Sequence, residues 1–237
     1  MDTVINAGFE LRPRLAAVAN LVLPDQTVAD IGANHGYLPL YLVERGICPF
    51  AIATESSETS LAVLRKNMEK SEFKEKIALR LGNGLQVLAP GEAATICLAG
   101  MGGQTIQEIL SASPKVARSA RRLLLQPQKG IPALRRYLQA NGWRLIAEDI
   151  AYDNGFYYEI LALEPGQMVL SENELRFGPL LMSQKHPLFR PYWRRKLKGV
   201  REIVAILENM TSVQAQEKYH FWQEEARRIE RILRIMR

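Results

Sequence analysis

The sequence predicts an α/β fold, in which a doubly wound and mostly parallel sheet is followed by a helical C-terminal part. Three observations support this prediction. From residue 27 to residue 140, short apolar runs alternate with runs of helical period, as they do where helices cover both faces of a parallel sheet. Asp153-Asn154-Gly155 separates two further strands, and Asn-Gly is a strong hairpin signal, so the final strand is antiparallel. After residue 190, apolar residues recur at heptad spacing.

The elements of the sheet follow from these patterns in chain order. Leu11, Leu15, Val18 and Val22 recur at helical spacing and predict a first helix that ends before Pro24. Each expected strand is a short apolar run ended by a glycine, a proline or a polar turn. The strands are expected at about 27–31, 50–54, 77–81, 94–98, 122–126, 143–149 and 156–163. Helices are expected at about 38–46, 58–68, 103–110 and 131–140.

The sheet domain is expected to end at Glu164-Pro165-Gly166. We therefore predict one domain over 1–165 and a helical domain over 166–237. In the second domain, two series of apolar residues step alternately by three and four positions, which predicts two helices joined near Thr211-Ser212 as an antiparallel coiled-coil hairpin. The series are Trp193, Leu197, Val200, Val204, Leu207 and Tyr219, Trp222, Ala226, Ile229, Leu233, Met236.

The charge is distributed unevenly between these parts. Residues 1–175 contain 17 Lys and Arg against 19 Asp and Glu, and residues 176–237 contain 14 against 6. The whole excess of the chain, +6 at pH 7, therefore lies in the last quarter. This asymmetry predicts a near-neutral catalytic body that carries a polyanion-binding arm. The alternative is an ordinary solvated helical face rich in Arg.

Several classes of protein do not fit the composition. We find no run of about 18 uncharged apolar residues and thus expect no transmembrane helix. The N-terminus lacks the basic and apolar regions of a signal peptide, so we expect a cytoplasmic protein. Cys48 and Cys97 are too few for a disulfide framework. His35, His186 and His220 are scattered, and no Cys, His and Asp spacing predicts a metal site.

The stretch from Asp30 to Gly36, Asp-Ile-Gly-Ala-Asn-His-Gly, joins the first strand to a helix through a glycine turn. Such a unit lets backbone N–H groups approach a ligand closely. Its first residue is acidic, unlike the dinucleotide fingerprint Gly-x-Gly-x-x-Gly. An acid there would repel a pyrophosphate and suits a ligand with an amine, which predicts S-adenosylmethionine (SAM). A parallel sheet with one reversed final strand is typical of Rossmann-like SAM-dependent methyltransferases, whereas a dinucleotide site or a structural turn is the alternative.

Two further strand ends supply candidate cofactor ligands. Glu55 follows the glycines by about 20 residues, where a carboxylate binds ribose hydroxyls. This spacing alone does not separate NAD from SAM. Asn83 ends the third strand and could contact an adenine, with Gly82 and Gly84 allowing close backbone approach. A plain turn would also use these two glycines.

The ends of the fourth and fifth strands predict the side of the second substrate. Gly100-Met101-Gly102-Gly103 and Gln126 follow those strands at the same edge of the sheet, where a second substrate would meet the methyl group. A tight turn explains the glycines nearly as well, and a simple strand terminator explains Gln126 as well.

These motifs together resemble the bacterial tRNA (adenine(22)-N1)-methyltransferases of the TrmK type over nearly the whole chain. The resemblance implies a Rossmann-like catalytic domain with a coiled-coil C-terminal domain, and methyl transfer from SAM to N1 of an adenine in the D-loop region of tRNA. The matching segments are Arg14-Leu15, Asp30-Ile31-Gly32, His35-x-Tyr37-Leu38-Pro39, Glu55, Gly82-Asn83-Gly84-Leu85, Ala99-Gly100-Met101-Gly102-Gly103, Leu125-Gln126-Pro127, Tyr158-Glu159 and Phe177-Gly178-Pro179.

The resemblance also implies roles for single residues. Asn34, Met101 and Gln126 are expected on the side of the target base. Arg14 would meet either the SAM carboxylate or an RNA phosphate. The expected cofactor residues are Arg14, Asp30, Gly32, Asn34, Gly36, Glu55, Asn83, Gly84, Ala99 and Gly100. The basic residues expected to hold tRNA phosphates are Arg190, Arg194, Arg195, Lys196, Lys198, Arg227, Arg228, Arg231 and Arg234.

The chain departs from the family pattern at Asn34 and Asn83, where the family usually has Asp, and at Gly36, where it usually has Ala. Adenine N1 attacks with its own lone pair, so no general base is required and positioning is the main task. A carboxylate at residue 34 would stabilise the developing positive charge, and we therefore expect Asn34 to slow the reaction without abolishing it.

Other functions compete with this interpretation. One is a methyltransferase that acts on a different base or a small molecule, although a small-molecule enzyme would not need the basic arm. Another is an RNA-binding protein that holds SAM but has lost turnover, which the two Asn residues motivate. An NAD-dependent oxidoreductase is disfavoured by Asp30 and by the final hairpin. We expect a monomer, since a heptad hairpin closed on itself needs no partner.

Overall fold

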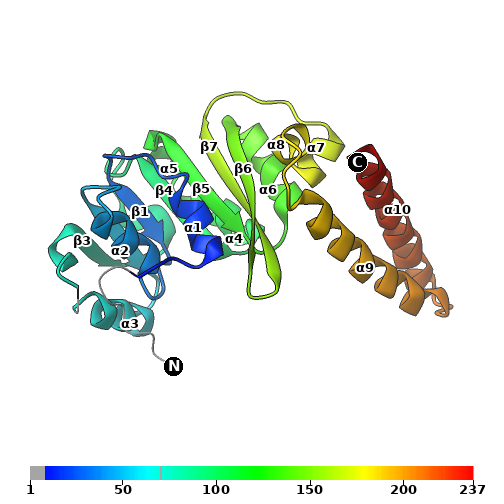
Figure 1. Cartoon of the computed structure of the whole chain (residues 1–237), viewed down its shortest axis with the longest axis horizontal. Helices are drawn as coiled ribbons and strands as arrows, with labels where there is room; N and C mark the ends of the chain where they lie inside the picture. Colours follow the sequence, from blue (N-terminus) through cyan, green and yellow to red (C-terminus); the bar gives the residue numbers. More distant parts are fainter. Residues whose placement is uncertain (1–8, 70, 237) are drawn as a thin grey trace. The chain divides into compact units, whose positions relative to one another are not determined.

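The structure is a computed structural model that describes residues 9–69 and 71–236. The chain forms two compact units, one ending at Leu180 and the other beginning at Leu181. The first unit is an α/β sheet domain, and the second contains two long helices (Figure 1).

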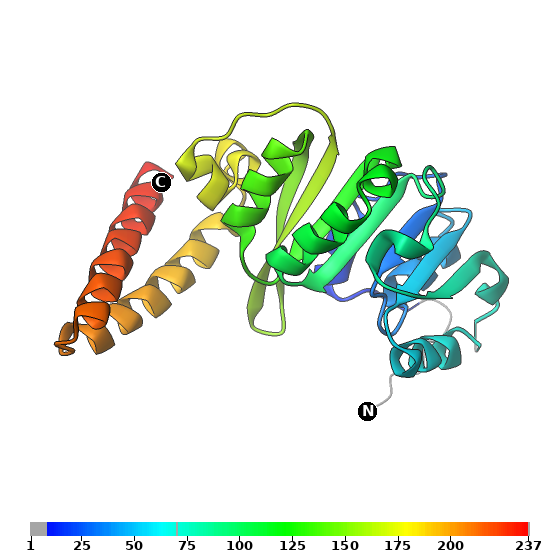
Figure 2. The same cartoon turned by 180° about the vertical axis from the view of Figure 1, so that it is seen from behind.

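The first unit is built on a seven-stranded sheet with the strand order β3-β2-β1-β4-β5-β7-β6. Strands β1 to β5 run parallel, β7 pairs with β5 antiparallel, and β6 pairs with β7 antiparallel. This is the predicted Rossmann-like arrangement with an antiparallel edge (Figure 2). The strands are β1 (Val28–Ile31), β2 (Ala51–Glu55), β3 (Ile77–Leu81), β4 (Thr95–Met101), β5 (Arg122–Pro127), β6 (Trp143–Asp153) and β7 (Phe156–Pro165).

The helices alternate with the strands, and several were not predicted from the sequence. The expected first helix over 11–22 is shorter, because Pro13 occupies its first turn and turn-type hydrogen bonds replace the helix after Asn20. Within the described residues, the helices are α1 (Pro13–Ala19), α2 (Tyr37–Glu44), α3 (Glu58–Met68), η1 (Lys74–Lys76), η2 (Gly84–Val87), α4 (Gly103–Ala112), α5 (Pro114–Ser119), α6 (Ile131–Ala140), α7 (Glu172–Phe177), α8 (Pro179–Ser183), α9 (Phe189–Glu208) and α10 (Val213–Ile235). The short α5, α7 and α8 contain too few turns for an apolar period to appear in the sequence.

The hairpin turn lies where the sequence predicts it, but its strands are longer than expected. Asn154 and Gly155 have φ angles of 49° and 80°. Both residues are therefore in the left-handed region that a two-residue hairpin turn of type I′ requires. Pairing continues through Asp153 opposite Phe156, so that the first hairpin strand exceeds its predicted end at residue 149.

The predicted domain boundary at residue 165 is wrong, because the segment up to Leu180 is bonded to the sheet unit. The backbone N–H of Leu170 donates to Gln139 Oε1 at 2.6 Å, and the N–H of Leu180 donates to Glu148 Oε2 at 2.8 Å. Arg135, a fully buried residue of α6, donates to the Leu175 carbonyl at 3.0 Å. These side chains lie far from the segment in sequence, so Pro165-Gly166 ends a strand without ending the domain.

The second unit contains α9 and α10, which lie side by side in both views (Figures 1 and 2). The guanidinium of Arg190 donates to the carbonyls of Leu233 and Met236 at 2.8 Å, which joins the start of α9 to the end of α10 and makes the pair antiparallel. Ser212 caps α10 by accepting from the N–H of Ala215. Of the predicted apolar series, the residues Trp193, Leu197, Val200, Ala226 and Ile229 are buried.

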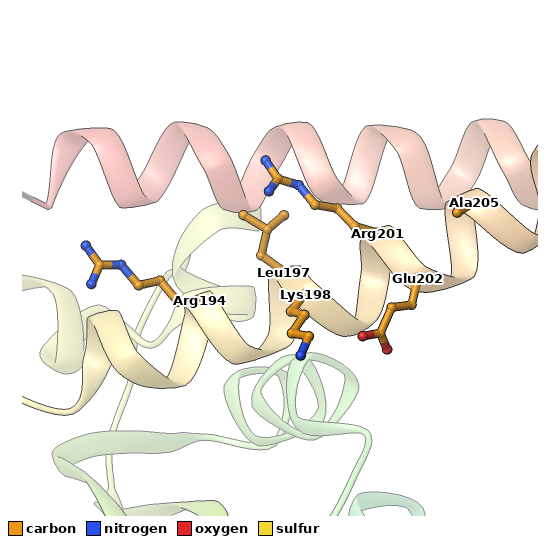
Figure 3. A pocket seen from close by; sticks show the side chains of 6 residues that line it. All are labelled: Arg194, Leu197, Lys198, Arg201, Glu202 and Ala205. Atoms are coloured by element: carbon orange, nitrogen blue, oxygen red, sulfur yellow. The ribbon is translucent and has the colours of Figure 1, made fainter.

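The outer part of the second unit is less well covered. Val204 and Leu207 of the predicted seam are only half-buried, and Ile206 beside them is 63% exposed. Six residues of α9 line a groove on this unit (Figure 3). Within the described residues, none of the helices has the length and apolar content that a membrane crossing requires.

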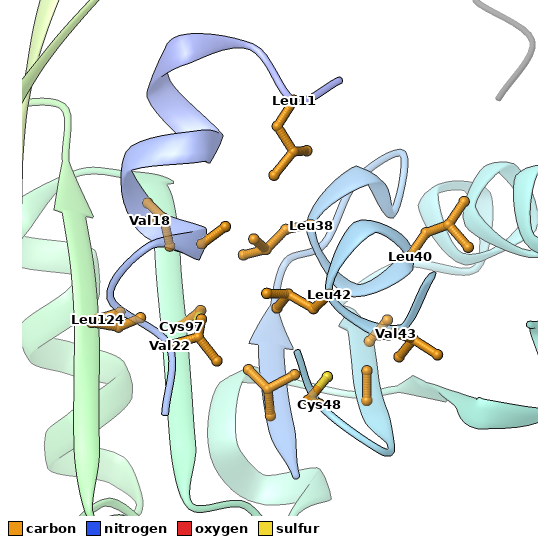
Figure 4. Close-up of a cluster of buried hydrophobic side chains, with 14 of the residues drawn as sticks. Leu11, Val18, Val22, Leu38, Leu40, Leu42, Val43, Cys48, Cys97 and Leu124 are labelled. Atoms are coloured by element: carbon orange, nitrogen blue, oxygen red, sulfur yellow. The ribbon is translucent and has the colours of Figure 1, made fainter. Parts of the chain in front are cut away.

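The core of the first unit lies in two layers, one on each face of the sheet. Because side chains alternate along a strand, Val28 of β1 packs on one face, and Ala29 and Ile31 pack on the other. The first layer joins the sheet to α1, α2 and α3, and Figure 4 shows its centre around Leu38 and Leu42. The second layer joins the sheet to α4, α5 and α6. Both layers hold the parallel strands so that their carboxyl ends meet at one edge.

Candidate functional site

The loop between β1 and α2 lies at the carboxyl edge of the sheet and is shaped by left-handed residues. Gly32, Asn34 and Gly36 have φ angles of 72°, 54° and 75°. The N–H groups of Gly32 and Ala33 both donate to the Thr54 carbonyl at 3.0 Å, which holds the loop against the end of β2. The loop is therefore shaped by its own left-handed residues and held in place by the end of β2.

Two glycines of this loop also have side chains close to where a Cβ would lie. A Cβ on Gly32 would lie 2.6 Å from the terminal methyl carbon of Met101. A Cβ on Gly36 would lie 2.6 Å from Leu64 and 2.7 Å from Met68, both on α3. The Ala that the family pattern has at this position would here adopt a left-handed backbone and would displace the side-chain ends of Leu64 and Met68. Met101 of β4 and the first turn of the loop are in contact, which brings the predicted cofactor and target sides together.

Glu55 lies beside the loop, as its position at the end of β2 predicts. Its carboxylate accepts a hydrogen bond from the backbone N–H of Asn34. The contact uses the backbone of residue 34, so an Asp in its place would keep it. The carbonyl of Glu55 also accepts from the N–H of Gly82 at 2.9 Å, which ties the loop after β3 to the same point.

Asp30 is buried at the end of β1, with 5% of its surface exposed. Its pKa is raised to about 7, first by burial and then by the nearby Glu55 carboxylate, while the Arg14 guanidinium opposes both effects. Two acidic groups at one edge of a dry site favour a positively charged ligand over an anionic one. This electrostatic setting fits SAM, whose sulfonium and ammonium groups are cationic, and not a pyrophosphate.

Arg14 and Gln126 form a second cluster at the same edge. The side-chain oxygen of Gln126 accepts from Arg14 Nη1 at 2.9 Å and from the Gly100 N–H at 3.1 Å, and its amide donates to the Pro127 carbonyl at 3.2 Å. The guanidinium of Arg14 lies over the ring of Tyr158, 5.7 Å from its centroid. Gln126 is fully buried. It therefore orients Arg14 and the Gly100 loop, whereas the sequence pattern predicts that it faces the target base.

The glycines from Gly100 to Gly103 are needed for packing within the protein as well as for close approach of a ligand. Gly100 has a φ of 79°, and the pairing of β4 with β5 is irregular between Ala99 and Met101. A Cβ on Gly103 would lie 2.8 Å from the Lys129 carbonyl oxygen. Gly103 is thus needed where two loops meet, while Ala99 and Gly100 remain half-buried at the edge.

Asn83 and Gly84 lie at the end of β3 and differ in exposure. Asn83 is exposed and precedes η2, so its amide is accessible at the rim. Gly84 is buried, and a Cβ there would lie 2.9 Å from Ile109 of α4. Gly84 therefore shapes the loop through packing, and Asn83 is the group able to contact a ligand.

The predicted residues of the sheet unit are brought together at one edge, and two neighbours were missed. Tyr158 supports Arg14 from β7, and its only sequence signal is the Tyr158-Glu159 motif. Asp153 of the hairpin pairs with Arg12 at 2.8 Å. No short-range pattern connects residues this distant in sequence. In the part of the chain that the structure describes, no cluster of His, Cys, Asp and Glu could hold a metal ion.

Some basic residues of the second unit contact other groups of that unit, and some line a groove on α9. Arg190 donates to carbonyls at the end of α10, and Arg227 and Arg228 approach Glu224 on their own helix. Arg194, Lys198 and Arg201 line the groove of about 530 Å³ on α9, with Leu197, Glu202 and Ala205. Figure 3 shows Arg201 pointing toward α10, where it pairs with Glu230 at 2.7 Å.

Comparisons with known proteins agree with this geometry. Residues 28–231 match a family model described as TrmK, tRNA (adenine(22)-N(1))-methyltransferase. The chain is 33% identical to the tRNA (adenine(22)-N(1))-methyltransferase of Bacillus subtilis over 201 residues, which are 82% of this chain and 84% of the relative.

Solved structures are similar over nearly the whole chain. The m1A22 tRNA methyltransferase TrmK of B. subtilis has a TM-score of 0.84 and 30% identity, over 94% of this chain and 99% of that one. A Streptococcus pneumoniae protein described as a candidate tRNA (m1A22) methyltransferase, solved in complex with S-adenosyl-L-methionine, has a TM-score of 0.85 and 35% identity, over 94% of this chain and 100% of that one.

Proposed function

Because the chain belongs to the TrmK family of tRNA (adenine(22)-N1)-methyltransferases, we propose which of its residues hold the cofactor, face the adenine and bind the RNA. The protein is a SAM-dependent enzyme that methylates N1 of adenine 22 in tRNA. The observation that carries this function is the family match over residues 28–231, since it spans both the sheet and the C-terminal helices. SAM supplies a methyl group that is activated by its bond to a sulfonium sulfur.

The cofactor site is formed by the loops after β1, β2 and β3, with Arg14 and the end of β4. The backbone from Gly32 to Gly36 approaches the methionine part, and the carboxylates of Asp30 and Glu55 attract its ammonium group and the ribose hydroxyls. Asn83 contacts the cofactor's adenine from the exposed rim. Support for this assignment comes from the acidic pair beside a loop whose turn excludes a Cβ. The full set is Arg14, Asp30, Gly32, Asn34, Gly36, Glu55, Asn83, Gly84, Ala99 and Gly100.

The target adenine lies beside Asn34 and Met101, at the ends of β1 and β4. Adenine N1 has its own lone pair, so these residues need to hold the base in line and need not remove a proton. The Asn34 side-chain carbonyl accepts from the exocyclic amino group. Gln126 does not contact the adenine in this proposal. Its side-chain oxygen orients Arg14, and Arg14 binds the SAM carboxylate. The adenine must be unpaired or flipped to reach this site.

The helical unit is a coiled-coil hairpin that binds tRNA phosphates. Exposed cations of α9, including Arg194 and Lys198 in the groove, support this role, because phosphate contacts fix position without reading sequence. The proposed phosphate contacts are Arg190, Arg194, Arg195, Lys196, Lys198, Arg227, Arg228, Arg231 and Arg234. We propose a monomer that works in the cytoplasm.

The test of the function is methylation of unmodified tRNA transcripts by the purified full chain with SAM, followed by digestion to nucleosides and mass spectrometry. We expect 1-methyladenosine, and its loss from a transcript in which adenine 22 is replaced by guanine. A different methylated nucleoside would reject N1 of adenine 22 as the target. SAM binding without any methylation would reject turnover and favour an RNA-binding protein that holds SAM.

Asn34→Asp tests the target side of the site. We expect the single-turnover rate of methyl transfer to rise about tenfold, because a carboxylate stabilises the positive charge that develops on the adenine. Asp tolerates the left-handed backbone of residue 34 about as well as Asn. Asn83→Asp is the matched control, with an expected change in SAM affinity and none in the rate. An unchanged rate in Asn34→Asp would remove residue 34 from the reacting base.

A further inference from the structure

The tip of the β6–β7 hairpin, residues 152–157, lies at the same edge of the sheet as the proposed target site. Leu125 of β5 pairs with Leu161 of the antiparallel β7, and β6 is antiparallel to β7, so β6 runs in the same direction as β5. Its end therefore lies with the carboxyl ends of the parallel strands. At about 3.3 Å per residue, the tip projects about 10 Å past the end of β5. Figure 2 shows the hairpin extending beyond its neighbours in the sheet.

Aromatic side chains are exposed at this tip. Phe156 is 59% exposed and Tyr152 is 47% exposed. The ring of Tyr152 lies 4.7 Å from that of Tyr157, its direct partner on the other strand. Within the described residues of the sheet unit, no other exposed large apolar side chain is aromatic. An exposed aromatic cluster of this kind is costly in water and indicates a contact surface.

The tip has one aromatic surface on each side of the hairpin. Tyr152 and Tyr157 are paired and share one face, and Asp153 and Phe156 are paired and share the other. Tyr158 follows Phe156 by two residues and therefore lies on the same face as Phe156, where it supports the Arg14 guanidinium. Phe156 therefore lies on the same face of the hairpin as Tyr158, which contacts the cluster of Arg14 and Gln126.

An ion pair holds the tip in place. Arg12, just before α1, donates through Nε and Nη2 to Asp153 Oδ1 at 3.2 and 2.8 Å. The Arg12 side chain is 57% exposed, so it presents a cation beside the rings while it fixes the hairpin. A projecting two-stranded tip is weakly stable without such a contact. A fixed tip loses less entropy when a ligand binds.

We propose that this tip binds the unpaired nucleotides next to the target adenine, with Phe156 and the Tyr152–Tyr157 pair stacking on their bases and Arg12 contacting a phosphate. The proposal rests on the proposed function, since it concerns the same tRNA. When an adenine flips out of its stack, the bases on either side of it lose a stacking partner. Aromatic side chains can stack on these bases whatever their identity, because every base has a π face. The surface fits single-stranded RNA because it combines separate π faces with a cation.

The experiment is a steady-state comparison of full-length variants on unmodified tRNA transcripts. For Phe156→Ala and for Tyr152→Ala we expect the KM for tRNA to rise about five- to tenfold, which is the lower end of the effect of one lost base stack. We expect SAM affinity and the unfolding temperature to stay as in the wild type. Phe156→Trp is expected to retain the wild-type KM, whereas Phe156→Leu, which keeps apolar bulk without a π face, is expected to behave like the Ala variant.

The matched control is Val169→Ala. Val169 is 92% exposed in the segment that follows Pro165, and Pro165 is the end of β7 away from the hairpin tip. We expect no change in KM for this variant. A transcript with 4-thiouridine beside adenine 22 should also cross-link to residues 152–157, as mass spectrometry of the peptides would show.

The outcomes separate the two proposals. If the wild type methylates adenine 22 but the tip variants keep its KM and no cross-link forms, the stacking proposal is overturned and the function stands. If Phe156→Leu retains full activity, the contact is apolar and not stacking, which also overturns the proposal. If the wild type methylates no tRNA, the proposed function fails, and the stacking proposal fails with it.

Discussion

The two halves of the candidate site are built in different ways. The loop after β1 gets its shape from its own backbone, through the left-handed residues Gly32, Asn34 and Gly36. The cluster at the end of β5 instead depends on side chains, because Arg14 and Gln126 come from elements 112 residues apart in sequence. The first half is rigid by local geometry, and the second half is rigid because each polar atom of a buried Gln has a partner.

This difference determines how each half should respond to substitution. A turn built on left-handed glycines is destabilised when a side chain is added. A residue with a Cβ in that conformation costs about 1–2 kcal/mol of folding free energy even without a steric clash. A buried hydrogen-bond cluster fails when one partner is removed, since an unsatisfied group costs about 1–3 kcal/mol. The following predictions test the comparison, in order of decreasing effect.

Gly32→Ala should have the largest effect. We expect SAM affinity to fall about 100-fold, from backbone strain together with displacement of Met101, whose methyl carbon would lie 2.6 Å from the new Cβ. Isothermal titration calorimetry with SAM measures this change. Gly46→Ala is the matched control, because Gly46 has a φ of 65° and nothing within 4 Å of an added Cβ. It should lose about 1 kcal/mol of stability and keep SAM affinity. Equal SAM affinity in the two variants would contradict the role of the Gly32 turn.

Gln126→Leu should have the next largest effect. It removes the acceptor shared by Arg14 and the Gly100 N–H. We expect SAM affinity to fall about 10- to 30-fold, consistent with the loss of a charged hydrogen bond. Gln128→Leu, the same change at an exposed neighbour, should leave affinity as in the wild type. A higher KM for tRNA with unchanged SAM affinity would instead assign Arg14 to an RNA phosphate.

The pKa of Asp30 predicts a pH dependence on the cofactor side. SAM is cationic and should bind the ionised carboxylate, so affinity should rise about tenfold between pH 6 and pH 8 for a group with a pKa of about 7. Calorimetry at the two pH values measures this change. Asp30→Asn should bind SAM weakly and without this pH dependence. The same dependence in wild type and variant would assign the titration to another group.

The stability of the SAM-free protein should change with pH in the opposite direction to its SAM affinity. The raised pKa means that the folded state of the SAM-free protein binds a proton that the unfolded state has lost above pH 4. Stability should therefore fall as pH rises from about 4 to about 7 and then level off. Asp30→Asn should unfold at a higher temperature than the wild type at pH 8, so that one substitution lowers binding and raises stability.

The smallest effect is expected for single cations of the arm. Lys198→Gln should weaken tRNA binding about threefold and lower the slope of log affinity against log salt by about one. Fluorescence anisotropy over a salt series measures both quantities. Lys66→Gln, an exposed position on α3, is the control and should leave the slope unchanged. A salt slope near zero for the wild type would contradict a phosphate-binding arm.

Most of the sheet could be predicted from its sequence. Apolar runs, glycine turns and the Asn154-Gly155 signal act over a few residues, and they located all seven strands and the antiparallel edge. The predicted boundary at residue 165 failed because the bonds that tie the following segment to the sheet start at Arg135, Gln139 and Glu148. The coiled-coil character of α9 and α10 stays a prediction.

The candidate site shows the same division. The loop from Asp30 to Gly36 and the set of strand ends at one edge follow from the amino-acid sequence alone, because they depend on local backbone preferences and on strand period. The burial of Gln126 behind Arg14, the closeness of Met101 to Gly32 and the ion pair between Arg12 and the hairpin tip appear only in the folded chain. Those contacts join residues far apart in the chain, and they form only when the packed sheet brings its carboxyl ends together.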